Sequence, residues 1–182
     1  MINFGLETWA NITISVVIYV AGAFLLLFIA NLIFAIWFKH ILKKHSAGMS
    51  VTLNAKFDNI KKLFDIMKKL NVKIDQKYLD AIDSIDANSF KHQWTEECKK
   101  SRDKLTYLRD EALFIARSQK NLEKNNEFIT AKNNVIEMDT VYRNIVACYN
   151  ADVLGYNYWI SFWPTRWIWK MLKFKNRDLL EL

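Results

Sequence analysis

An uncharged, apolar run from Thr8 to Phe38 constrains this chain more than any other feature of its sequence. A helix needs about 20 apolar residues to cross a hydrocarbon core of about 30 Å, and this run is longer. Glu7 is the only charged residue before Phe38, so the start lacks the positively charged region of a cleaved signal peptide. We therefore expect a retained transmembrane helix over residues 8–38, preceded by a short extracytoplasmic segment, residues 1–7.

The residues that flank this run predict its orientation. Lys39, Lys43 and Lys44 follow the run at once, and no positive side chain precedes it. Because positive residues favour the cytoplasmic side, we expect a single-pass protein of the cytoplasmic (inner) membrane, with residues 39–182 in the cytoplasm. Asn31 lies inside the run, and we expect its amide to face another helix of the same chain or of a second copy.

The remainder of the chain predicts helices. Four Gly and one Pro are too few for a many-stranded β fold, which needs frequent turns. We predict an all-α protein in which the N-terminal transmembrane helix is followed by an antiparallel helical bundle with two long helices, over residues 39–164. The segment His45-Ser-Ala-Gly-Met-Ser50 is interpreted as a joint.

Apolar residues at helical spacing place the individual helices. We expect one helix after the joint, a short helix near residues 78–85, a long helix over about residues 90–122, and a final long helix from about residue 128 to Pro164. Their stripes keep heptad spacing over several turns, which is typical of helices that pack in bundles and coiled coils. Cys98 and Cys148 are both expected on packed faces, as free thiols.

The last helix carries a repeated Tyr-Asn pair, Tyr149-Asn150 and Tyr156-Asn157. A tyrosine ring can be buried while its hydroxyl reaches a polar partner. The adjacent amides would bond to a neighbouring helix and fix its register, as buried Asn does in coiled coils. We interpret these residues as a helix-packing motif made of Tyr142, Tyr149, Asn150, Tyr156, Asn157 and Pro164, with Gly155 allowing close backbone approach.

These residues resemble the C-terminal signature of the LemA family of bacterial membrane-anchored proteins. The signature has Tyr-Asn twice, then a Pro, then an apolar helix that closes in Gly-Phe; Pro164 and Phe174 fall at the corresponding steps. The chain departs from it at three places, with Trp163 for Phe before the proline, Lys173 for Gly before Phe174, and Arg143 for Asn. The resemblance implies an outside N-terminus, a cytoplasmic helical bundle and no established enzymatic activity.

Basic and aromatic residues alternate in the last segment, residues 165–182. This composition is typical of a helix that lies on an anionic membrane surface, although a helix packed back on the bundle would also account for it. The residues that would contact the membrane interface are Trp163, Arg166, Trp167, Trp169, Lys170, Lys173, Phe174 and Lys175.

The sequence offers few signs of chemistry. His40, His45 and His92 lack the spacing of a metal motif, and the carboxylates Asp83, Asp86, Glu96 and Glu97 lack the Glu-x-x-His pairing of a di-metal bundle. We expect no enzymatic activity, no metal and no cofactor.

The expected function is a non-enzymatic membrane scaffold of the LemA type, which self-assembles as a homo-oligomer and contacts the lipid bilayer and unidentified protein partners. The alternative is a membrane-remodelling or anionic-lipid-sensing protein that acts through its basic, Trp-rich tail. The net charge of +7 would also suit nucleic acid, but the basic residues form no recognised reading module, and we do not expect that partner.

Overall fold

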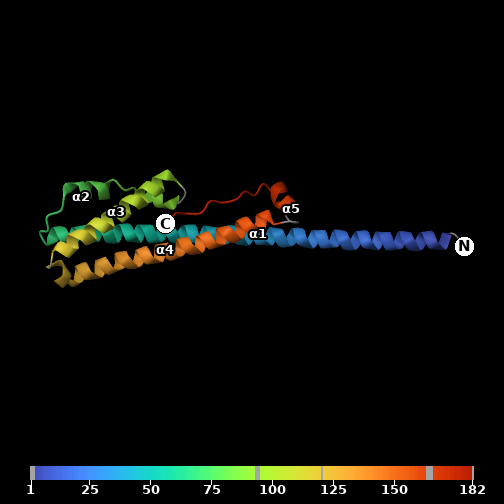
Figure 1. Ribbon diagram of the computed structural model, residues 1–182, viewed down its shortest axis with the longest axis horizontal. Coiled ribbons are helices and arrows are strands. Elements are labelled where there is room, and N and C mark those ends of the chain that lie inside the picture. The colour runs from blue at the N-terminus through green and yellow to red at the C-terminus, as the bar shows by residue number, and fades with distance from the viewer. Residues whose placement is uncertain (1–2, 93–94, 120, 163–165, 182) are drawn as a thin grey trace. The chain divides into compact units, whose positions relative to one another are not determined.

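The computed structural model describes residues 3–92, 95–119, 121–162 and 166–181, and the described residues contain helices and no strand (Figure 1). The elements are α1 (Asn3–Lys69), α2 (Gln76–Asp83), η1 (Ala87–Lys91), α3 (Glu96–Ser118), η2 (Leu122–Lys124), α4 (Asn126–Ser161) and α5 (Arg166–Met171). The prediction of an all-α protein with a long apolar N-terminal helix is therefore confirmed. The chain divides into two compact units, which are described in turn.

Helix α1 continues through residues 45–50 without a break, so the predicted joint is wrong. A single Gly in a helix interior costs only about 1 kcal/mol relative to Ala, which neighbouring turns and packing offset. A Cβ added at Gly48 would lie 3.5 Å from Ile145 Cδ1. Gly48 therefore faces α4 across a packed contact and does not mark a hinge.

The first unit comprises residues 1–41 and 155–177. In α1, the side chains from Thr8 to Leu27 are exposed, and this stretch is long and apolar enough to cross a membrane. Asn31 is the first buried residue along this stretch, while Ile33, Ile36 and Trp37 beyond it are still exposed. Beyond it, an apolar cluster joins Ala35 and Phe38 of α1 to residues of α4 and α5, namely Tyr156, Ile160 and Trp169.

Asn31 itself donates from Nδ2 to the carbonyl of Leu27 at 2.7 Å, within its own helix. Its Oδ1 is buried and has no hydrogen-bond partner among the described residues.

The sequence interpretation of Gly155, that it allows close backbone approach, needs correction. A Cβ added there would lie 3.8 Å from Phe38 Cζ, an ordinary contact distance, so close approach does not require glycine at this position.

The second unit comprises residues 42–154 and 178–182, and its core combines α1, α2, α3 and α4. Helices α1 and α4 run antiparallel, because residues further along α1 meet residues earlier in α4. His45 Nε2 lies 2.8 Å from Asp152 Oδ2, and Lys56 pairs with Asp139. Helix α3 is also antiparallel to α4, since Arg102 meets Tyr142 and Arg109 meets Asp139.

Capping residues set where these helices begin and end. Thr95 Oγ1 accepts from Cys98 N at the start of α3, and Asn125 Oδ1 accepts from Phe128 N at the start of α4. Helix α3 therefore begins at Glu96, later than predicted. Helix α1 ends in a Schellman motif, in which Asn71 adopts φ 55° and Val72 N donates to Met67 O at 3.0 Å.

The two cysteines differ in environment. Cys98 is buried, as predicted, and burial raises the pKa of its thiol. Cys148 is exposed, so its predicted place on the packed face is wrong. It directly precedes the buried Tyr149, and adjacent helical residues point about 100° apart because 3.6 residues make one turn.

Candidate functional site

The tyrosines of the repeated motif are buried in their own units. Tyr142, Tyr149 and Tyr156 are each at most 5% exposed. The Tyr142 hydroxyl accepts from Arg102 Nη1 at 3.3 Å, and the Tyr156 hydroxyl donates to the carbonyl of Lys175 at 3.2 Å. Each ring therefore packs in the interior, while these two hydroxyls reach partners at its edge.

The two asparagines hold the backbone of the C-terminal segment, which we call the C-terminal strap (residues 175–181). Asn150 Nδ2 donates to Leu180 O, and Leu180 N donates to Asn150 Oδ1, both at 2.9 Å. Asn157 makes the same two bonds with Arg177, at 2.8 and 2.9 Å. Sequence reasoning expected these amides to meet a neighbouring helix, whereas their partner is a chain segment without regular secondary structure.

The spacing of the Tyr-Asn repeat follows from this pairing. Asn150 and Asn157 are seven residues apart in a helix, and their partners Leu180 and Arg177 are three residues apart. Seven residues are nearly two turns of a helix that has 3.6 residues per turn. A heptad step therefore presents Asn150 and Asn157 on nearly the same face of α4, and each amide binds a strap residue of its own unit.

Helix α5 ends in a second Schellman motif, and Lys173 occupies its left-handed position. Lys173 has φ 58°, Phe174 N donates to Trp169 O at 3.0 Å, and the rings of Trp169 and Phe174 lie 5.1 Å apart. Glycine favours this conformation because it has no Cβ. The Gly-Phe ending of the LemA signature thus has a structural reason, and this chain places Lys where Gly is favoured.

The predicted membrane-interface residues do not share one face. Trp169 is buried, as is its neighbour Ile168, whereas the other described members of the set are exposed: Arg166, Trp167, Lys170, Lys173, Phe174 and Lys175. The helix covers only Arg166–Met171 of the predicted tail. Trp163, which was assigned to this set, and Pro164, which was assigned to the helix-packing motif, lie outside the described residues.

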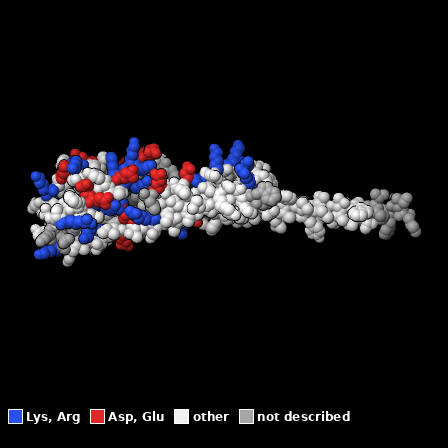
Figure 2. Space-filling model, viewed as in Figure 1, with Lys and Arg blue, Asp and Glu red and all other residues white. Residues whose placement is uncertain are grey.

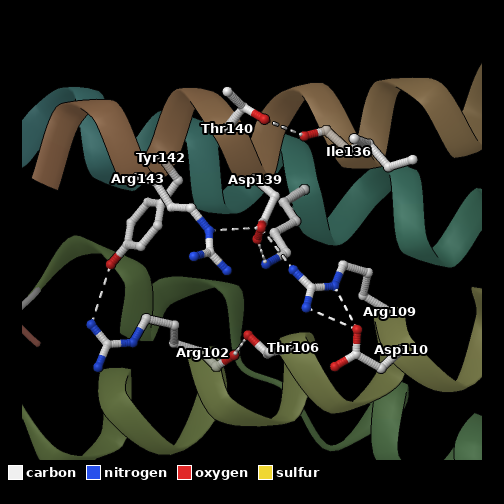
Figure 3. Close-up of polar contacts among 10 residues, drawn as sticks. Arg102, Thr106, Arg109, Asp110, Ile136, Asp139, Thr140, Tyr142 and Arg143 are labelled. Carbon is white, nitrogen blue, oxygen red and sulfur yellow. Dashed lines mark hydrogen bonds and ion pairs between the residues drawn. The ribbon is translucent and has the colours of Figure 1, made fainter. Parts of the chain in front are cut away.

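A second polar site lies between α1, α3 and α4 of the second unit, centred on Asp139 of α4 (Figure 3). Three cations surround this one carboxylate. Lys56 Nζ donates to Oδ1, Arg109 Nη1 lies 2.7 Å from Oδ2, and Arg143 Nε lies 3.1 Å from Oδ2. Lys56 is only 2% exposed, so its ammonium depends on Asp139 for charge neutralisation.

The pKa directions of the pair reflect this excess of positive charge. Burial would raise the pKa of Asp139, but the hydrogen bond and charge of Lys56, with Arg109 nearby, hold it below its usual value. The pKa of Lys56 is lowered, because burial and the charges of Arg109 and Arg143 outweigh its pairing with Asp139. The site therefore favours a negative charge and disfavours a further positive one.

Sequence reasoning missed Lys56 and Asp139, although both carry a signal. Lys56 lies between Leu53 and Ile60 at heptad spacing, and Asp139 precedes Tyr142 by three residues on the buried seam of α4. A charged residue at a seam position needs a partner across the interface. Among the residues the structure describes, no group of three or more His, Cys, Asp or Glu side chains could hold a metal ion.

The family model of the LemA family matches residues 45–182, which includes both Tyr-Asn pairs and the strap. The chain belongs to the LemA family. Comparison with curated proteins and with solved structures gives no significant match. In this LemA-family protein the matched region therefore contains the two asparagine pairings and the Asp139 cluster, while the exposed apolar part of α1 lies before it.

Proposed function

We propose that this LemA-family protein is a non-enzymatic, membrane-anchored scaffold that assembles with further copies of itself. The observation that carries the proposal is an exposed apolar stripe on α4, outside the buried seam. Its members are Ala147, Ala151 and Leu154 of the second unit, at a 4-3 spacing, and Leu154 is 57% exposed. This spacing is the one that pairs two helices, so the same stripe on a second copy is a fitting partner.

Charges on the rest of the second unit are mixed and do not favour a partner of one sign. Figure 2 shows Lys and Arg side chains interspersed with Asp and Glu over this unit. By contrast, the apolar stretch of α1 shows neither colour. Contact through helices therefore explains the exposed surface better than electrostatic capture of a polyanion does.

The exposed thiol of Cys148 offers a direct test, because it lies beside the stripe and Cys98 is buried. In mild detergent, a bismaleimide should link copies of the full-length protein through Cys148, and light scattering should report more than one copy. Leu154→Lys should shift the protein to monomers and abolish the crosslink. Since Leu154 is largely exposed, the change should leave the fold intact.

Phe114→Lys on α3 is the matched control, because Phe114 is 70% exposed and lies off the stripe. It should leave the assembly unchanged. A wild-type protein that is monomeric at every concentration would refute self-assembly, and equal dissociation by both variants would refute the role of the stripe.

The proposal places the N-terminus outside and the helical units in the cytoplasm. Support comes from Lys39, Lys43 and Lys44, which are exposed directly after the apolar stretch. A membrane-impermeant maleimide should therefore label Cys148 only after the cells are lysed. Labelling of Cys148 in intact cells would reverse the orientation.

A second candidate, recognition of anionic lipid, is favoured by where α5 packs in the first unit. Trp169 joins Ala35 and Phe38 in the apolar cluster, near the end of the apolar run at Phe38. Because Lys39 follows the run directly, this end of α1 would lie near the membrane interface. The exposed Arg166 and Lys170 would then lie at headgroup depth.

This second candidate predicts a measurable depth for α5. A spin label at Met171→Cys, in a Cys148→Ser background, should be accessible to oxygen in nanodiscs and lose mobility when anionic lipid is added. Lys100→Cys on α3 is the control and should report water. A label at residue 171 that behaves like the one at residue 100 would remove the lipid role.

A further inference from the structure

A cleft beside Asp139 is lined by more basic groups than its carboxylates neutralise. It measures about 330 Å³, at the small end of ligand sites. Its charged lining consists of four cations and three carboxylates: Lys56, Lys99, Arg102, Arg143, Asp103, Asp139 and Glu181. Arg109 adds a further cation next to the cleft, through its contact with Asp139.

Two guanidinium groups on facing helices have donors to offer. Arg102 of α3 donates to the Tyr142 hydroxyl, which is a neutral acceptor. Arg143 of α4 uses Nε for Asp139, and Figure 3 shows its guanidinium projecting from α4 toward α3. Each guanidinium carries five N–H donors in a plane, a geometry that suits the oxygens of phosphate.

One of the three carboxylates belongs to the C-terminal strap and is weakly held. Glu181 Oε2 lies 3.3 Å from Lys99 Nζ, and the two side chains are 81% and 49% exposed. Exposed ion pairs of this kind contribute little. Glu181 can therefore leave the mouth of the cleft while Asn150 still holds the strap at Leu180.

We propose that this cleft is a binding site for a phosphate group, either free phosphate or a phosphomonoester headgroup, with Arg102 and Arg143 as its main donors and Glu181 as a displaceable carboxylate at its mouth. Asp139 orients Arg143, and Thr106, whose hydroxyl donates to Arg102 O, also lines the cleft. Asp103 is the one lining carboxylate on α3, and its negative charge would repel a phosphate. Because Asp103 is exposed, water screens this repulsion.

The test uses the full-length protein in a nonionic detergent, titrated with inorganic phosphate at constant ionic strength and followed by ³¹P line broadening. Wild-type protein should bind phosphate saturably. Arg102→Gln should weaken binding about tenfold, through loss of a charge-assisted hydrogen bond. Glu181→Gln should tighten it about two- to fivefold, because a competing carboxylate is removed.

Arg117→Gln is the matched control, since it removes the same charge from an exposed position on α3 outside this cleft. Its affinity should equal that of the wild type, and circular dichroism should show every variant equally helical. A second titration with monomeric dihexanoyl phosphatidic acid identifies the source, because tighter binding there assigns a lipid headgroup and tighter binding of inorganic phosphate assigns a free anion. The absence of saturable binding in both titrations, or equal losses in Arg102→Gln and Arg117→Gln, would overturn the proposal.

Discussion

Replacement of Asn150 by Asp isolates the contribution of one asparagine to holding the C-terminal strap. Asn150 accepts from Leu180 N and donates to Leu180 O, both at 2.9 Å. Asp has the same shape and keeps the acceptor, but it loses the donor and sets a negative charge against the Leu180 carbonyl. The substitution therefore breaks one of two bonds with little change in packing.

The expected magnitude follows from the two bonds. Each contributes about 0.5–1.5 kcal/mol net, and a carbonyl facing a carboxylate adds repulsion. We expect the strap to be held less strongly by about 1–2 kcal/mol, which raises the population of the detached strap about 5- to 30-fold. Global stability should change little, because Asn150 lies at the edge of the core and Leu180 is only partly buried.

Hydrogen exchange of the Leu180 amide measures this population directly. Exchange at Leu180 should accelerate by the same 5- to 30-fold in Asn150→Asp. Asn157→Asp should accelerate exchange of the Arg177 amide more than exchange of the Leu180 amide. Asn144→Asp is the matched control, because it adds the same charge at an exposed position on α4. Equal acceleration in Asn144→Asp, or unprotected Leu180 in the wild type, would refute the pairing.

Three further predictions test the packing. Lys173→Gly should slow amide exchange at Phe174 by stabilising the end of α5 by up to about 1 kcal/mol, because a left-handed residue with a Cβ is strained; Lys173→Ala should give no such gain. Gly155→Ala should increase the free energy of unfolding by about 1 kcal/mol and so raise the thermal midpoint, because its Cβ would meet Phe38 at an ordinary distance. A lower midpoint would show that the helix needs glycine there. Asp139→Asn should destabilise the protein by about 3 kcal/mol at neutral pH, because it leaves Lys56 buried without a counter-charge. Since the pKa of Asp139 in the folded protein lies below 3.8, the carboxylate contributes to stability above about pH 4, and this contribution is lost as the pH falls through the folded pKa. The difference in thermal midpoint between wild type and Asp139→Asn should therefore narrow in acid. A constant difference would contradict the assignment.

The helical pattern was predictable because it rests on local periodicity. The stripe from Leu53 to Met67 is buried apart from the half-buried Phe57, and the heptad tyrosines of α4 are buried. The joint at residues 45–50 was not predictable, because a single glycine leaves the choice between a hinge and a packed contact to its neighbours. Ile145, which is distant in the sequence, decides it.

The partners of polar side chains were the other failure. The repeat of Tyr-Asn signalled that the two amides act alike, and periodicity placed them correctly beside the buried seam. It could not reveal that their partner is the backbone of residues 177 and 180, since a backbone partner leaves no mark in the side chains of that segment. Lys56 and Asp139 were missed because each finds its partner in a distant part of the chain, which local periodicity does not identify.

The sequence by itself determined an apolar helix long enough to cross a membrane, a body made of helices, and membership of the LemA family, because hydropathy, periodicity and a spaced motif are local properties of the chain. Only the tertiary structure decided that α1 continues unbroken, that the asparagines hydrogen-bond to the backbone of the C-terminal strap, and that three cations contact Asp139. Those facts depend on which distant residues meet, and that is fixed by the packing of whole helices.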